Sequence, residues 1–384
     1  MLFDVPVAWL QLTRERPRLL AAVAGVTFAV VLVFMQLGFR EALFASSVRL
    51  HGMLVGDLFL IHPQTSYLVS MKPFSRRRLY QTLGVDGVES VSPVYAGLTL
   101  WKNPATATSR NIFLIGVDPT ATTLDIETVN RQRDKIRRTD IVLFDEASRP
   151  EYGPVVETLR AGHAMVTDVG ARRVTVEGLF QLGTSFGVDG TLVTSDSNFL
   201  RLLPIRQKGL IDIGVIRLRE GADADAVRDA VAAHLPNDVE VLTKPQFMRR
   251  ERAFWEHSTP IGFVCGFGMV MGLVVGLVIV YQILFADISD HLAEYATLKA
   301  MGYTNWNLIS IVFQEATILA ILGFLPGLAI SAYLYRLTQH ATFLPMDLDM
   351  GSIASVLALT IGMCCASGAM ALRKVRTADP AEVF

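Results

Sequence analysis

The sequence predicts a membrane α-helical protein with four transmembrane helices and a large mixed α/β extracytoplasmic domain between the first helix and the second. Half of the residues are hydrophobic (51%) and only 18% are charged, whereas soluble domains carry about 25% charged residues. Four long runs are nearly free of charge, and a helix needs about 20 apolar residues to cross the hydrocarbon core. More than two hundred residues of ordinary soluble composition separate the first run from the second.

The predicted transmembrane segments are 19–39, 258–286, 308–335 and 350–372. Arginines precede the first segment, as they precede the apolar core of a signal peptide. This run is longer than such a core, however, and no small-x-small cleavage site follows it. We therefore interpret it as a membrane span.

Four spans place both chain ends on one side of the membrane. We assign that side to the cytoplasm, with an interfacial amphipathic helix in 1–18, a loop in 287–307 and a tail in 373–384. Segments 40–257 and 336–349 then lie outside. Basic residues flank spans on both sides, so charge favours this orientation by a small margin.

The segment 40–257 is expected to alternate strands and helices. Short runs rich in β-branched residues predict strands at 57–61, 88–101, 111–117, 141–144, 173–180, 191–194, 211–218 and 239–242. Amphipathic runs predict helices at 76–83 and 223–235. Each of these two helices leads through a polar turn into a strand. The similarity predicts two βαβ-like halves, with a β-rich insertion at about 120–207.

Glycines recur at intervals of four in two of the spans. Steps of four bring residues near one helix face, where glycine lets two backbones approach closely. We interpret these glycines as helix-packing residues, although glycine is also common in membrane helices in general. Pro326 should bend the third span, because it removes a backbone donor. The packing candidates are Gly262, Gly266, Gly268, Gly272, Gly276, Gly323 and Gly327.

Glu315 is an acid inside the third predicted span. An intramembrane acid is costly unless it is paired or close to water. Glu315 is either a proton-relay residue or a structural contact. No partner acid or histidine stands in the other spans, so we favour the structural role.

The loop 287–307 contains a predicted amphipathic helix. Ile288, Leu292, Tyr295 and Leu298 recur at helical spacing, and Gly302 is a plausible helix stop. Such a helix either lies in the membrane interface or docks a partner protein and passes force to the adjoining spans.

No motif for chemistry stands out in the chain. It lacks the phosphate-binding pattern Gly-x-x-x-x-Gly-Lys-Ser/Thr. The three cysteines all lie in apolar runs, and the seven histidines are scattered without metal-ligand spacing. The pair Asp145-Glu146 is interpreted as solvated or capping acids. We expect no catalysis, no metal and no cofactor in this chain, and the net charge of −1 argues against nucleic-acid binding.

Several stretches resemble the FtsX-like/MacB-like permease family of ABC transporters. In that family an acid on a cytoplasmic loop precedes a basic-Ala-apolar-Gly turn, which Glu294 and 299–302 match. Gln314-Glu315 and the proline-containing tail 378–384 match further family positions. Within the family the sequence is most similar to the DevC type, the permease of heterocyst-type glycolipid exporters. The stretches that carry this likeness are 8–12, 34–39, 88–93, 287–302 and 378–384.

The resemblance implies a type VII ABC transporter fold in a bacterial inner membrane, with a periplasmic domain. It implies a homodimer that pairs with a separate ATPase, which binds ATP and Mg. The loop helix would couple to that ATPase. The coupling candidates are Asp290, His291, Glu294, Tyr295, Lys299, Met301 and Gly302.

The resemblance also implies partners on the outer side. The periplasmic domain would engage an adaptor (a membrane fusion protein) and a TolC-like outer-membrane channel, to export a glycolipid-like or other amphiphilic cargo. Two alternatives to export stay open. The first is a non-transporting, FtsX-like signalling permease that activates a periplasmic hydrolase. The second is a lipoprotein-releasing permease.

Overall fold

The computed structural model describes residues 16–185, 187–290 and 305–377. By internal contacts the chain divides into two compact units. The first, which we call the helical unit, takes its described residues from Met1–Ala42, Pro260–Ala341 and Met346–Phe384. The second, the α/β unit, comprises Leu43–Thr259 together with the short segment Thr342–Pro345.

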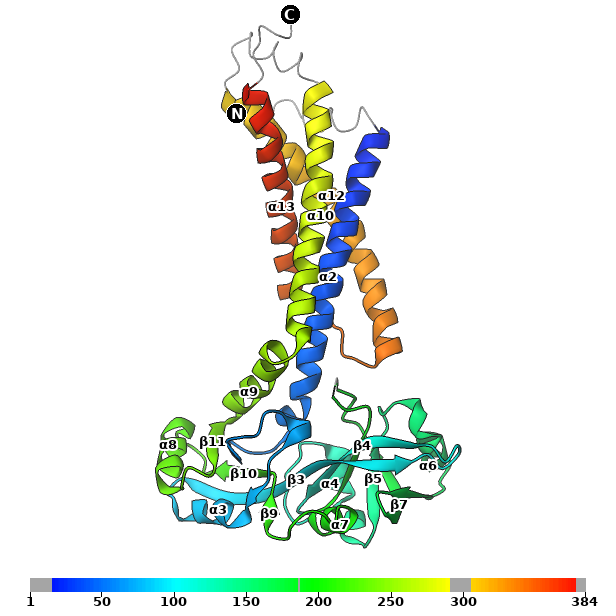
Figure 1. Ribbon diagram of the computed structural model, residues 1–384, viewed down its shortest axis with the longest axis vertical. Helices are drawn as coiled ribbons and strands as arrows, with labels where there is room; N and C mark the ends of the chain where they lie inside the picture. The colour runs from blue at the N-terminus through cyan, green and yellow to red at the C-terminus, as the bar shows by residue number, and fades with distance from the viewer. Residues whose placement is uncertain (1–15, 186, 291–304, 378–384) are drawn as a thin grey trace, which may run out of the picture. The chain divides into compact units, whose positions relative to one another are not determined.

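The described residues of the helical unit form four long helices, α2 (Arg16–Met53), α10 (Pro260–Asp290), α12 (Asn305–Thr342) and α13 (Met350–Thr377) (Figure 1). All four are long and apolar enough to cross a membrane. Each is longer than the run that predicted it, and α2 continues from Phe39 to Met53. Its first part therefore belongs to the helical unit and its last part to the α/β unit.

The α/β unit is organised around a nine-stranded mixed sheet in the order β11-β1-β10-β3-β4-β8-β5-β7-β6, with a separate two-stranded pair β2-β9. The strands are β1 (Leu58–Ile61), β2 (Phe74–Ser75), β3 (Val88–Lys102), β4 (Ser109–Val117), β5 (Ile141–Asp145), β6 (Met165–Val169), β7 (Arg172–Phe180), β8 (Thr191–Ser195), β9 (Leu210–Ile211), β10 (Ile213–Leu218) and β11 (Glu240–Thr243). The helices are α3 (Arg76–Gln81), α4 (Glu127–Arg131), α5 (Arg133–Arg137), α6 (Val155–Arg160), α7 (Asp196–Leu202), α8 (Ala224–His234) and α9 (Lys244–His257), with 3-10 turns at Leu68–Ser70, Thr82–Gly84 and Pro150–Tyr152.

One end of the sheet consists of two interleaved strand–helix–strand units. The first runs β1–α3–β3 and the second β10–α8–β11. Strand β10 pairs antiparallel with both β1 and β3, and β11 pairs antiparallel with β1. The order β11-β1-β10-β3 is therefore that of a ferredoxin-like sheet.

The other end of the sheet curls back on itself. Strands β4 and β8 are parallel, as are β5 and β7, while β5–β8 and β6–β7 are antiparallel. Trp101 at the end of β3 pairs with Val169 of β6. The strands β3-β4-β8-β5-β7-β6, in their order in the sheet, therefore form a closed ring of neighbours. The buried Trp101 indole donates from Nε1 to the carbonyl of Tyr152, at 3.0 Å.

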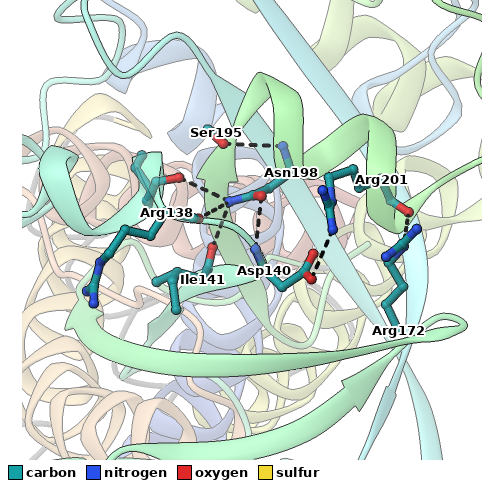
Figure 2. Close-up of polar contacts among 8 residues, drawn as sticks. Arg138, Asp140, Ile141, Arg172, Ser195, Asn198 and Arg201 are labelled. Atoms are coloured by element: carbon teal, nitrogen blue, oxygen red, sulfur yellow. Dashed lines mark hydrogen bonds and ion pairs between the residues drawn. The ribbon is translucent and has the colours of Figure 1, made fainter.

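The side chain of Asn198, in the first turn of α7, holds the backbone that leads into β5 by hydrogen bonds (Figure 2). Its amide nitrogen donates to the carbonyls of Ile136 and Arg138, at 3.0 and 2.8 Å. Its amide oxygen accepts from the backbone nitrogen of Asp140, at 3.0 Å. Asp140 has a φ of +57°, a conformation that few non-glycine residues adopt. A side chain that satisfies three backbone groups at once therefore fixes this turn.

Candidate functional site

Glycines on α10 form a closely packed contact with α2. A Cβ atom added at Gly268 would lie 2.5 Å from Gln36, and one at Gly276 would lie 2.6 Å from Ala29 and 2.5 Å from Met363. At Gly272 the nearest atom, in Leu32, would be 3.3 Å away. Carbon atoms normally rest about 3.5–4.0 Å apart. Three of the glycines that the sequence singled out thus lie where a larger residue would be crowded.

The glycines of α12 pack against the same helix. A Cβ at Gly323 would lie 2.5 Å from Val26, and one at Gly327 would lie 2.6 Å from Val30. The close approach lets the hydroxyl of Thr27 donate to the carbonyl of Gly323, at 3.1 Å. This bond lies one turn before Pro326, which removes a backbone donor from α12.

Two of the predicted packing glycines lie elsewhere. Gly266 has no heavy atom within 4 Å of the position its Cβ would take, and Gly262 lies half-buried near the start of α10.

Two glycines of α2 were not among the predicted packing residues. A Cβ at Gly25 would overlap Ile279 of α10, and one at Gly38 would overlap the ring of Tyr335 of α12. The Tyr335 hydroxyl also donates to the carbonyl of Phe34. Helix α2 is thus the common partner of α10 and α12, with glycine on both sides of each contact. The sequence signal was present, because both glycines stand within the predicted span 19–39 or at its end.

Asp290 is the one coupling candidate inside the described residues. Its carboxylate accepts from the guanidinium of Arg18, with Nη2 and Oδ2 2.7 Å apart. The contact joins the start of α2 to the end of α10. Both side chains are partly exposed to solvent, so the ion pair contributes little stability by itself. The other candidates lie outside the described residues, namely His291, Glu294, Tyr295, Lys299, Met301 and Gly302.

Glu315 is completely buried in α12, on a helix face that includes Ala316 and Leu319. The structural role that we favour for this acid stays a prediction. Among the residues that the structure describes, no three His, Cys, Asp or Glu side chains come together in a way that could hold a metal ion.

The α/β unit contains buried carboxylates. Glu251 of α9 accepts from the backbone nitrogen of Leu68 at 2.8 Å and from the Trp255 indole at 2.9 Å. Burial raises the pKa of Glu251 to about 7, although both hydrogen bonds favour the ionised form. The Nε2 atom of the buried His51 lies 3.6 Å from this carboxylate.

Asp212, between β9 and β10, is buried against β3. It accepts from the backbone nitrogen of Ala96 at 2.9 Å and pairs with Arg206 at 3.0 Å. Burial raises the pKa of Asp212 to about 6, and the guanidinium of Arg206 opposes that rise.

Asp145, at the end of β5, was interpreted from the sequence as a solvated or a capping acid, and the structure decides between the two. Its side chain is fully buried, and it caps backbone nitrogens instead. It accepts from Leu182, Gly183 and Ala147 at 3.0, 2.9 and 3.1 Å. Burial raises the pKa of Asp145, and these three bonds oppose the rise. The capping interpretation therefore describes this residue and the solvated one does not.

A cavity of about 1070 Å³ lies beside Asp145, within the α/β unit. We call it the β5–α6 cavity, because its walls are the loop after β5, the helix α6 and the hairpin loop between β3 and β4. Its lining mixes apolar residues with ion-paired groups such as Glu146 and Arg160, which are 2.8 Å apart.

Comparison with protein-family models gives two matches. Residues 19–234 match the model of the MacB-like periplasmic core domain. Residues 266–380 match the model of the FtsX-like permease C-terminal region. Together the two models cover three of the four predicted spans completely, the second span from residue 266 onward, and most of the α/β unit. They agree with the predicted fold class and with the family resemblance, but neither distinguishes the DevC type. No curated protein matched the sequence.

Three solved structures each match about half of this chain. The periplasmic region of MacB from Actinobacillus actinomycetemcomitans is 10% identical, with a TM-score of 0.36, and covers 54% of this chain and 96% of its own. The extracellular domain of the noncanonic ABC-type transporter YknZ from Gram-positive bacteria is 12% identical, with a TM-score of 0.32 and coverages of 49% and 99%. A domain of a putative permease protein from Porphyromonas gingivalis is 13% identical, with a TM-score of 0.31 and coverages of 50% and 89%.

Proposed function

This chain belongs to the family of MacB-like and FtsX-like ABC transporter permeases, and from that membership we propose that it is the permease subunit of a tripartite exporter. Permeases of this family are inner-membrane proteins with a periplasmic domain, are generally non-catalytic and work with an ABC ATPase partner. In the proposed complex two copies of this chain pair with two ATPase subunits. ATP and Mg are held by the ATPase.

Helix α2 is the observation that carries the proposal. It is one unbroken helix whose first part belongs to the helical unit and whose last part belongs to the α/β unit. Both α10 and α12 pack against α2 through glycines, so a shift of either helix displaces α2. A helix resists stretching because each residue is hydrogen-bonded along its axis. Motion at its cytoplasmic end is thereby delivered to the periplasmic domain.

The ATPase engages the segment 287–307 in this proposal. The ion pair between Arg18 and Asp290 ties the end of α10, where that segment begins, to the start of α2. A push on the loop helix by the ATPase is then shared by two spans. Glu294 and Lys299 make the contact with the ATPase, and Gly302 ends the loop helix.

The outer partners follow from the resemblance to DevC-type permeases. We infer an amphiphilic, glycolipid-like cargo that is passed to an adaptor and a TolC-like channel. The signalling and lipoprotein-releasing roles are the alternatives, because the same ATP-driven motion would serve either one. An adaptor that co-purifies favours export, whereas activation of a periplasmic hydrolase favours signalling.

Co-expression with the ATPase tests the proposal. The full chain in lipid nanodiscs should stimulate ATP hydrolysis by the ATPase. Glu294→Ala and Gly302→Val should abolish that stimulation while the protein still inserts. Thr158→Val is the control, because it lies outside this segment, in the α/β unit, and its hydroxyl donates to the carbonyl of Pro154, four residues earlier. Normal stimulation by both loop variants would contradict the coupling assignment.

Protease protection tests the orientation. In right-side-out vesicles, external protease should cleave within 43–259 and leave the segment around His291 intact. The opposite pattern would overturn the proposed topology.

A further inference from the structure

One wall of the β5–α6 cavity is formed by a segment of the chain's own connection between α12 and α13. Phe343 lines the cavity together with Phe144 of β5 and Val156 of α6. The segment Thr342–Pro345, which we call the strap, belongs to the α/β unit by its contacts. Yet it is continuous with α12, which ends at Thr342, and lies a few residues before α13.

A hydrogen bond fastens the strap to the α/β unit. The hydroxyl of Thr184 donates to the carbonyl of Phe343, at 3.2 Å. Thr184 is itself buried, and a buried hydroxyl that loses its partner is costly. The strap and the turn that receives it therefore satisfy each other.

Side-chain hydrogen bonds also hold the turn at 182–184, to which the strap is bonded. The carboxylate of Asp145 binds the backbone nitrogens of Leu182 and Gly183, immediately before Thr184. Arg49 donates to the carbonyl of Leu182, at 3.0 Å. The same carboxylate binds the backbone nitrogen of Ala147 in the cavity wall. Asp145 thus orders both the anchor of the strap and the cavity that its aromatic ring lines.

The strap is strained at its central residue. Phe343 has a φ of +60°, in the left-handed region that bulky residues avoid. Such a conformation persists only where the surrounding contacts enforce it, and it is relieved when those contacts are lost. Docking of the strap is therefore opposed by its own backbone.

We propose that the strap is a releasable link, which docks in the β5–α6 cavity in one state of the transport cycle and leaves it in another. The inference rests on the proposed function, because ATP binding by the partner supplies the motion. Both ends of the strap continue into predicted spans, so a shift of α12 or α13 pulls directly on Phe343. The strap adds to α2 a second connection through which the spans act on the periplasmic domain.

Hydrogen exchange of the full chain with its ATPase in nanodiscs measures strap release. Peptides that cover 342–349 should exchange at least about fivefold faster in the vanadate-trapped state than without nucleotide, which corresponds to about one lost hydrogen bond. Peptides over the cavity wall, 144–160, should respond with them. If the strap exchanges equally in both states while 260–290 responds to nucleotide, the link does not release and the proposal is overturned.

Variants test docking without nucleotide. Thr184→Val removes the donor at nearly constant shape, and it should speed exchange of 342–349 about fivefold. Thr158→Val is the matched control, because its hydroxyl donates to the carbonyl of Pro154, the residue before α6, and not to the strap. The amides in 342–349 should exchange faster in Phe343→Ala than in Phe343→Gly. Glycine adopts a positive φ without strain, so the docked strap is less strained in the glycine variant. Equal exchange in Thr184→Val and Thr158→Val would overturn the docked strap.

The nucleotide experiment and the nucleotide-free variants together distinguish failure of the strap proposal from failure of the proposed function. If 260–290 and 342–349 are both insensitive to nucleotide, the coupling to an ATPase fails and so does the release cycle that rests on it. The nucleotide-free comparison of Thr184→Val with Thr158→Val still decides whether the strap is docked by this bond.

Discussion

Replacing Gly323 by alanine tests the packing of α12 on α2. The new methyl carbon would lie 2.5 Å from Cβ and Cγ1 of Val26 and 3.3 Å from the backbone nitrogen of Thr27. Because Val26 is β-branched and fully buried, it has no free rotamer into which to retreat. Overpacking of this kind costs about 1–3 kcal/mol. The hydrogen bond from Thr27 to the Gly323 carbonyl should lengthen as the helices separate.

Gly266→Ala supplies the matched control. The same substitution is made in a neighbouring helix, but nothing lies within 4 Å of the new methyl group. The change in helix propensity is shared by both variants and cancels in the comparison. Gly276→Ala should destabilise the chain about as much as Gly323→Ala, since Cβ of Ala29 would lie 2.6 Å from the new methyl carbon and cannot move away as the side chain of Met363 can.

The buried cysteines provide the assay. Cys364 and Cys265 are shielded in the folded chain, so a fluorogenic maleimide reports their exposure as the full-length protein is heated in detergent. A loss of about 2 kcal/mol should lower the midpoint by roughly 2–3 °C for a chain of this size. If Gly323→Ala melts at or above the temperature of Gly266→Ala, the contact between α2 and α12 is not as close as described here.

Three further perturbations test other contacts. Asn198→Ala should speed exchange of the amides in β5 and α7 by about a hundredfold, since three hydrogen bonds to the backbone at about 1 kcal/mol each are lost. Ser197→Ala, on the exposed side of α7, should change it little. Glu251→Gln should flatten the pH dependence of the melting temperature. The folded-state pKa of about 7 exceeds the ordinary 4.5, so the wild type gains stability as pH falls through 7 towards 4.5 and loses it as pH rises through 7; an unchanged profile in the variant would exclude this carboxylate as the cause. Exchanging the charges of Arg18 and Asp290 should restore the ATPase stimulation that either single charge reversal lowers, and stability in all three variants should stay within about 1 kcal/mol of the wild type.

The elements of the fold could be predicted because each follows a strong local pattern. The run 88–101 became β3, which ends one residue later, and the helix predicted at 223–235 became α8. The four apolar runs became the four long helices, as the fold class requires. The closure of the sheet through Trp101 and Val169 could not be foreseen, because nothing local indicates which strands pair when they are 68 residues apart.

Packing partners were the part that sequence alone left open. The spacing of glycines in 262–276 indicated a close contact but not the helix that makes it. Gly25 and Gly38 are 13 residues apart, so they show no short periodicity, and only the structure places Ile279 and Tyr335 over them. The roles of Glu294, Lys299 and Gly302 stay predictions, since those residues lie outside the described part of the chain.

Buried acids were likewise indistinguishable from exposed ones in the sequence. Asp145 and Glu146 are adjacent, yet the first is buried beneath the turn that holds Thr184 and the second pairs with Arg160 near the surface. The difference arises because β5 is buried on both faces as far as Asp145 and ends there, so Glu146 belongs to the loop that follows. Where the buried part of the strand ends depends on elements far away in the chain.

The dependence of α2 on helices far along the chain has a consequence for biosynthesis. Ribosomes add about 5–20 residues per second, so roughly 10–40 s pass between the synthesis of α2 and that of α10. During that interval lipid or an insertase must cover the surfaces that Gly25 and Gly38 later present to Ile279 and Tyr335. The first helix has to insert alone, and its nascent surface stays open to wrong partners until α10 and α12 are made.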